Sequence, residues 1–86
     1  MELRHLRYFV AVVEEQSFTK AAEKLFIAQP PLSRQIQNLE QELDIQLFER
    51  GSRPLKTTEA GQFFYQHAVK LLSNAEEIKS MTKRIG

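Results

Sequence analysis

Apolar residues recur every three or four positions along three successive stretches of the chain, residues 3–15, 17–25 and 29–43. Residues at this spacing share one face of an α-helix. The apolar positions are Leu6, Phe9, Val10 and Val13 in the first stretch, Phe18, Ala21, Ala22 and Leu25 in the second, and Leu32, Ile36, Leu39 and Leu43 in the third. The pattern therefore predicts three short amphipathic helices.

The ends of these stretches indicate a tight turn between the second and third helices. Ser17 can cap the second helix, because its hydroxyl accepts a hydrogen bond from a backbone N–H that lacks a partner. Pro30 suits the first position of the third helix, where no N–H is needed. The turn over residues 26–28 lacks the glycine often found there. Two helices joined in this way predict a helix-turn-helix, whose second helix enters the DNA major groove with its first residues at the base edges.

Two short extended segments, Gln46–Glu49 and Leu55–Thr57, follow the third helix. Between them, Gly51 and Pro54 are residues that favour a turn. A two-stranded hairpin after a helix-turn-helix is a wing, and Arg53 would lie at its tip. Residues 1–57 are thus predicted to form a mainly α winged helix-turn-helix domain.

Residues 58–86 predict one long helix, because Thr57 or Thr58 can cap its start and no proline follows. Along it, large apolar residues recur every seven positions, with small residues three positions before each. The first 57 residues form too small a core to cover this seam. A partner helix is therefore expected, most simply from a second copy of the chain. The predicted dimer contacts are Phe64, Ala68, Leu71, Ala75, Ile78, Thr82 and Ile85, with Gly61 at the start of the seam and His67 beside it.

The composition excludes several classes of function. The absence of cysteine rules out disulfide frameworks, cysteine-based zinc fingers and thiol chemistry. His5 and His67 lie far apart, and the adjacent acids fall on solvent faces, so neither a metal site nor general acid–base catalysis is expected. No glycine-rich phosphate loop or nucleophile motif is present. We expect no enzyme activity, no cofactor and no membrane partner, and we expect a soluble cytoplasmic protein.

The distribution of charge is more informative than the net charge of +1. Phosphate binding needs local positive potential rather than a basic average. The segment 50–56 contains three basic residues and no acid, whereas acids crowd the end of the predicted third helix, away from its start. The basic residues are Arg50, Arg53 and Lys56, and the acids are Glu40, Glu42 and Asp44.

Polar side chains that can bind DNA gather at the start of the predicted third helix. Amide, hydroxyl and guanidinium groups reach phosphates and base edges. Gln29 suits an adenine edge or simply flanks the helix start, while Ser33 and Arg34 suit phosphate or base contacts or form a solvated face. Pro30 and Pro31 can start the helix and also offer apolar surface to thymine methyl groups.

Further candidates lie one helical turn along, on the second helix and in the wing. Gln37 is the weaker candidate on the third helix. Thr19 and Lys20 open the second helix, which holds the DNA backbone in this motif, although a plain surface role is equally open for Lys20. Arg53 suits a narrow minor groove, where a guanidinium responds to the potential. Arg50 can reach phosphate or brace the wing turn.

Three blocks of sequence together resemble the N-terminal DNA-binding domain of LysR-type transcriptional regulators, over essentially the whole chain. The blocks are LRYFVAVVEEQSFTKAAEKL, QPPLSRQIQNLEQEL and QLFERGSRPLKTTEAG. The Gln-Pro-Pro start is similar to that of regulators of aromatic catabolism that respond to muconate or benzoate. Two departures, Gln16 and Asp44, stand where the family usually has glycine at a helix end, which predicts local strain there.

The resemblance implies a linker helix over residues 58–86 that pairs antiparallel with its mate. It also implies a larger C-terminal domain that binds a small-molecule effector and is absent here. We therefore interpret the chain as an excised or truncated DNA-binding domain.

The sequence favours sequence-specific binding of double-stranded DNA by a homodimer on an interrupted inverted repeat. The alternative is a dimeric helical protein-interaction module without DNA readout, since the seam supports association equally in both cases. The basic segment 50–56 and the uncharged-to-basic start of the third helix favour DNA, because a protein partner would not require them.

Overall fold

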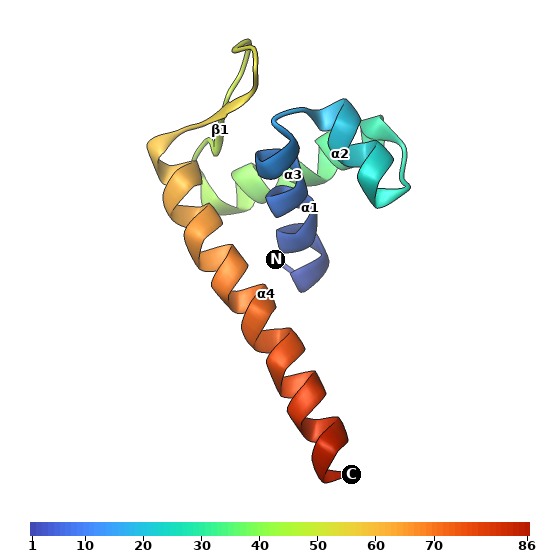
Figure 1. Cartoon of the computed structure of the whole chain (residues 1–86). Helices are drawn as coiled ribbons and strands as arrows, with labels where there is room; N and C mark the ends of the chain where they lie inside the picture. Colours follow the sequence, from blue (N-terminus) through green and yellow to red (C-terminus); the bar gives the residue numbers. More distant parts are fainter.

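Three short helices, a small wing and one long helix make up the molecule, and the computed structural model describes all residues 1–86. Figure 1 shows the short helices gathered at one end, the wing loop projecting beside them, and the last helix leading away as an arm. The predicted fold class, a mainly α winged helix-turn-helix followed by a long helix, is confirmed. In chain order the elements are α1 (Leu3–Glu15), α2 (Phe18–Leu25), α3 (Gln29–Leu43), β1 (Phe48–Glu49), β2 (Lys56–Thr57) and α4 (Glu59–Ile85). None of the helices has an apolar stretch of the length and hydropathy needed to cross a membrane.

The core lies where α1, α2, α3 and the start of α4 meet. Phe9 on α1 is fully buried, and its ring centroid lies 5.4 Å from that of Phe48 and 5.1 Å from that of Phe64. The predicted alanines of α2 are buried, so that the helix backbones can approach closely. Most apolar positions predicted from the periodicity are in this core, which comprises Leu6, Phe9, Ala11, Val12, Ala21, Ala22, Leu32, Ile36, Leu39, Leu47, Phe48 and Ala68.

Helix α3 begins one residue earlier than the position of Pro30 predicted. Ala28 has extended backbone angles, φ −74° and ψ 150°, and Gln29 is the first helical residue. Pro30 is therefore the second helical residue rather than the first. Pro30 and Pro31 both lie in the first turn, where backbone N–H groups have no acceptor within the helix, so neither proline interrupts α3.

Helices α1, α2 and α3 each end at a non-glycine residue in the left-handed region. Gln16 has φ 53°, Phe26 has φ 59° and Asp44 has φ 56°. This conformation places Cβ too close to the following carbonyl oxygen and costs roughly 1–2 kcal/mol. The predicted strain at Gln16 and Asp44 is thus located correctly. The sequence did not predict the left-handed conformation of Phe26, the first residue of the glycine-free turn.

The two wing strands are shorter than predicted. The antiparallel ladder pairs only Phe48 with Thr57 and Glu49 with Lys56. At one end of the hairpin, the Gln46 carbonyl accepts a hydrogen bond from the Thr58 hydroxyl at 2.7 Å. At the other, the Leu55 N–H donates to the Gln16 carbonyl at 3.2 Å. A side-chain bond between the flanking residues at one end and a bond to the end of α1 at the other therefore take the place of further ladder pairs.

The first part of the predicted dimer seam packs inside the molecule, which corrects the assignment of Phe64 and Ala68. The Phe64 ring meets Phe9 of the same chain edge-on, and Ala68 is buried in the core. Gly61 lies against the backbone of Leu47, which precedes the wing. The seven-residue repeat did not reveal this change of role, because a core face and a dimer face have the same periodicity.

Beyond Ala68, Leu72 still packs against the core, whereas the large apolar side chains further along α4 are exposed. Ile78 is 66% exposed and Ile85 is 89% exposed. Counting at 100° per residue places this exposed stripe beside the core-facing side of α4, and it includes two residues outside the predicted seam, Phe63 and Met81. We call this stripe the apolar α4 face, and it comprises Phe63, Leu71, Ile78, Met81 and Ile85.

Replacing Gly61 with alanine should destabilise the fold strongly. An added Cβ would lie 2.0 Å from the Leu47 carbonyl oxygen and 2.9 Å from its carbon, both of them backbone atoms. Because α4 and the segment before β1 would have to separate, we expect a loss of at least about 1–3 kcal/mol. Urea unfolding followed by circular dichroism measures it. Gly86→Ala is the control, because its Cβ would meet Thr82 at 3.7 Å, an ordinary contact; equal stability of the two variants would contradict the packing.

Alkaline pH should weaken the contact between α1 and α4. The Tyr65 hydroxyl donates to a Glu14 carboxylate oxygen at 2.9 Å. This hydrogen bond, then burial and the negative charge of Glu14, raise the pKa of Tyr65 above its usual 10.0. The neutral phenol is thus favoured in the folded state, and the stabilisation is present below about pH 10 and lost as the pH rises through the higher folded pKa.

The comparison variant is Tyr65→Phe, which cannot titrate. The melting temperature is measured by thermal unfolding at a series of pH values between about 8 and 11. As the pH rises, it should fall more in the unaltered protein than in the variant. Parallel decreases in the two proteins would show that the bond to Glu14 contributes nothing.

Candidate nucleic-acid interface

The first two turns of α3 carry the candidate base-contacting residues on one exposed end of the molecule. Pro30, Pro31 and Arg34 are exposed, whereas Gln29 and Ser33 are half-buried. The Gln29 amide nitrogen donates a hydrogen bond to the Ser33 hydroxyl oxygen at 2.7 Å. This bond links residues one helical turn apart and fixes the direction of the amide before any ligand is bound.

The Gln29 amide retains the groups needed to bind a base edge. The hydrogen bond to Ser33 uses one of the two amide hydrogens, and no protein group bonds to the amide oxygen. One donor and one acceptor therefore remain side by side, the combination that pairs with adenine in the major groove. The bond to Ser33 lowers the conformational entropy that the glutamine would lose on binding.

The first turns of α2 and α3 are both free of acidic residues. A helix N-terminus carries partial positive charge and unpaired N–H groups, which suit an anion such as phosphate. Thr19 and Lys20 are exposed at the start of α2, and the Lys20 N–H is already donated to the Ser17 hydroxyl at 3.1 Å. Gln37 is exposed one turn along α3 from Ser33. The predicted contact residues on these helices are therefore all accessible except for the inner parts of Gln29 and Ser33.

The loop of the wing projects from the molecule (Figure 1). Arg53, in the segment between β1 and β2, is exposed. Gly51 has φ 85°, which favours glycine at this position. The Ser52 hydroxyl donates to the Glu49 carbonyl at 2.8 Å and accepts from the Lys56 N–H at 3.2 Å, and so bridges the two strands. Arg53 therefore extends from a loop whose base is ordered by hydrogen bonds.

Arg50 is bound within the molecule, which favours the second of its two predicted roles, bracing the wing. Its guanidinium donates to the Glu40 carboxylate. The guanidinium carbon also lies 5.3 Å from the ring centroid of Phe18 and 6.0 Å from that of Phe48. Arg50 thus joins α2, α3 and β1, and it is a poorer candidate for a phosphate contact than Arg53.

Glu40 is the residue that the sequence analysis missed. The charge pattern placed it only among the acids that crowd the end of α3, away from the start of the helix, but its side chain is only 11% exposed. One carboxylate oxygen accepts from the Leu47 N–H at 2.7 Å and from the Phe48 N–H at 3.3 Å, and the other accepts from Arg50. The available signal was its position four residues after Ile36 and next to Leu39, at the edge of the buried face.

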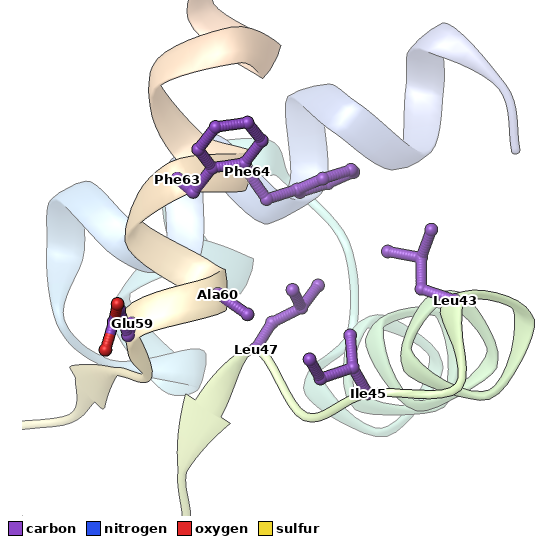
Figure 2. A pocket seen from close by; sticks show the side chains of 7 residues that line it. All are labelled: Leu43, Ile45, Leu47, Glu59, Ala60, Phe63 and Phe64. Atoms are coloured by element: carbon purple, nitrogen blue, oxygen red, sulfur yellow. The ribbon is translucent and has the colours of Figure 1, made fainter.

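An apolar hollow lies between the end of α3 and the first turns of α4. Figure 2 shows Ala60, Phe63 and Phe64 on the α4 side, facing the segment from Leu43 to Leu47, with Glu59 apart from the apolar side chains. The Phe63 ring centroid lies 4.4 Å from that of His67 on the next turn. Because Phe63 lines the hollow and also belongs to the apolar α4 face, the two surfaces are continuous. Its lining residues are Leu43, Ile45, Leu47, Glu59, Ala60, Phe63 and Phe64.

Relatives of known class match nearly all of this chain but only part of their own length. The chain is 81% identical over 85 residues to the HTH-type transcriptional regulator BenM of Acinetobacter baylyi, a match that covers 99% of this chain and 28% of BenM. It is 55% identical over 86 residues to the HTH-type transcriptional regulator CatR of Pseudomonas putida, covering 100% of this chain and 29% of CatR. The chain therefore spans under a third of the length of these regulators.

Solved structures agree with the fold over its full length. The BenM DNA-binding domain in complex with benA site 1 DNA superimposes with a TM-score of 0.98 at 80% identity, covering 100% of both chains. The CbnR DNA-binding domain in complex with DNA gives a TM-score of 0.93 at 38% identity, covering 99% of this chain and 98% of that one. Residues 3–62 match the family model described as bacterial regulatory helix-turn-helix protein, lysR family. The chain belongs to the lysR family of bacterial regulatory helix-turn-helix proteins.

Proposed function

We propose that this chain binds double-stranded DNA sequence-specifically, as the DNA-binding part of a transcriptional regulator. The observation that carries the proposal is the start of α3, whose first two turns present an oriented Gln29 amide and an exposed Arg34 and contain no acid. The likeness over the whole chain to BenM and CbnR DNA-binding domains, both solved with DNA, supports it.

The proposed contacts divide between three places on one end of the molecule. In the major groove, Gln29 and Arg34 read base edges, Pro30 and Pro31 contact thymine methyl groups, and Ser33 and Gln37 assist them. Thr19 and Lys20 hold the phosphate backbone beside α2. Arg53 enters the flanking minor groove, where A·T-rich sequence narrows the groove and strengthens its negative potential.

We further propose that two copies of the chain pair through the apolar α4 face. Its exposed side chains extend beyond the winged core, and a second α4 is a partner of matching length and chemistry. Antiparallel pairing about a two-fold axis would fix the separation of the two α3 helices, so the binding site should be an interrupted inverted repeat. Leu71, Ala75, Ile78, Thr82 and Ile85 remain the proposed contacts from the original seam, and Phe63, His67 and Met81 join them.

In the whole protein, residues 1–57 would serve as the DNA-binding domain and residues 58–86 as the linker and dimerisation helix. A further domain would bind a small-molecule effector, since the matched regulators are more than three times as long as this chain. The similarity to BenM and CatR is in line with control of genes for aromatic catabolism. Such a regulator has no need of catalysis or a cofactor, and it works in the cytoplasm, where bacterial DNA lies.

The test is fluorescence-anisotropy titration of this chain with an interrupted-palindrome duplex and its scrambled version, over a series of salt concentrations. Preference for the palindrome, with log affinity falling linearly in log salt, would support a dimeric DNA reader. The alternative function, a helical protein-interaction module, predicts equal weak binding to both duplexes or none, because the apolar α4 face alone accounts for association.

Replacing Gln29 with alanine should reduce the preference for the palindrome over the scrambled duplex by about 1–3 kcal/mol, because a bidentate base contact is lost. Gln66→Ala is the matched control, since Gln66 is an exposed glutamine on α4, outside the proposed contacts. Anisotropy titrations of both variants measure the two affinities. Equal losses on the two duplexes would mean that Gln29 does not read bases.

Replacing Ile78 with glutamate should weaken dimerisation, because each subunit would lose an apolar group worth about 1.5–3 kcal/mol on burial and gain a charge. The dimer dissociation constant should rise by at least about tenfold. Sedimentation equilibrium measures this constant for Ile78→Glu and for Ser80→Glu, which adds the same charge on the opposite side of α4. If the two variants dimerise equally, the apolar α4 face is not the interface.

A further inference from the structure

We infer that Glu40 and Arg50 are positioning residues, which set the direction of the wing so that Arg53 can contact DNA. This inference rests on the proposed function. Neither residue needs to contact DNA for this role. Instead, the pair links the helix that enters the major groove to the loop that carries the minor-groove contact.

The wing ladder alone cannot fix the orientation of the loop. It consists of two residue pairs, and an isolated two-stranded hairpin is marginally stable at best in water. Its orientation must therefore come from contacts with other elements, which are the packing of the buried Phe48 ring against Phe9 and Phe18 and hydrogen bonds to other elements. On the second strand side, the only such bond before the ladder is the one from the Leu55 N–H to the Gln16 carbonyl.

Glu40 provides the corresponding anchor for the first strand. Its carboxylate accepts the backbone N–H groups of Leu47 and Phe48, at 2.7 Å and 3.3 Å, and the Arg50 guanidinium. Hydrogen bonds to a charged acceptor are about twice as strong as neutral ones. The Glu40 side chain is 11% exposed, and a carboxylate so far removed from water needs hydrogen-bond donors, which these three groups supply.

Arg50 completes the anchor on the side of the wing that faces α2. Its guanidinium lies over the rings of Phe18 and Phe48, which contact each other edge-on with centroids 5.7 Å apart. A planar cation suits this position, and a lysine ammonium would reproduce the charge without the flat contact. Arg50 precedes Arg53 by three residues, so a change in its placement changes where the wing loop begins.

Removal of Glu40 has opposite expected effects on DNA binding if only charge matters and if Glu40 positions the wing. Glu40→Gln deletes a negative charge from a DNA-binding surface, which by charge alone would strengthen binding to phosphate. It would also release Arg50, and a released Arg50 would add affinity if its function were to bind phosphate. A positioning role instead predicts that Glu40→Gln weakens binding, because the contribution of Arg53 becomes smaller, so the two accounts differ in the sign of the change in affinity.

A double-mutant cycle on DNA binding separates them. Arg53→Ala is measured in three backgrounds: the unaltered chain, Glu40→Gln, and Glu42→Gln as a matched control. Glu42 lies on the same helix and is 53% exposed, and its one ion pair is with the Met1 amino group at 3.0 Å. Because removal of Glu42 causes the same change in net charge, it corrects for charge.

Arg53→Ala should weaken DNA binding in all three backgrounds. We expect the fold-loss of affinity in Glu40→Gln to be lower than in the other two backgrounds by a factor of roughly three or more, as for groups coupled through one network. An equal loss in all three backgrounds would overturn the inference, and so would an absence of any Arg53 effect in the unaltered chain. If the unaltered chain does not prefer the palindrome at all, the proposed function fails first, which is a distinct result.

Two further measurements keep the inference testable if Glu40→Gln folds poorly. Arg50→Lys retains both the acid and the positive charge, and a positioning role predicts that it too reduces the Arg53 contribution, whereas a phosphate contact predicts no such coupling. Hydrogen exchange without DNA should be faster at the Leu47 and Phe48 amides in Glu40→Gln than in Glu42→Gln. Unchanged exchange at both amides would show that Glu40 does not anchor the wing.

Discussion

The backbone at Leu47 is the point on which the arrangement of the other parts depends. Its N–H is accepted by Glu40 of α3, and its carbonyl accepts the Thr58 N–H at 3.0 Å at the start of α4. Gly61 lies against the same carbonyl, with no room for a side chain. The backbone of one residue therefore connects the helix proposed to enter the major groove, the wing and the long helix. Because these contacts involve backbone atoms and a buried carboxylate, they leave little freedom for the three parts to move independently.

Helix α4 has two environments along a single repeat. Its first turns pack on α1 through Phe64 and Ala68, and Tyr65 adds a hydrogen bond to Glu14. Further along, Ile78, Met81 and Ile85 are each at least half exposed. A helix in isolation gains little stability in water, and most comes from burial of its apolar face. The second half of α4 thus has a physical reason to pair, while the first half holds the pairing surface at a fixed angle to the winged core.

The proposed DNA surface depends on the placement of charge rather than its amount. With a net charge of +1, the chain has no general attraction for nucleic acid. Its acids are removed from the contact regions in different ways. Glu40 is engaged within the fold, and Glu42 pairs with the chain terminus. The first turns of α2 and α3 contain no acid, so their helix dipoles remain uncompensated by the protein. The result is local positive potential at the first turns and at Arg53, as phosphate binding requires.

The sequence by itself determined the elements and most of their ends, because apolar periodicity, the caps at Ser17 and Thr58, and the prolines of α3 act locally. It also determined the residue types at the start of α3, and hence the class of ligand. Local patterns could not show that Glu40 turns inward to bind the wing or that Arg50 is held there, since both depend on contacts with distant residues. Nor could the seven-residue repeat assign Phe64 to the core and Ile78 to the surface. Only the tertiary structure decided which half of that apolar stripe the winged core covers, because burial depends on how far the core extends along α4.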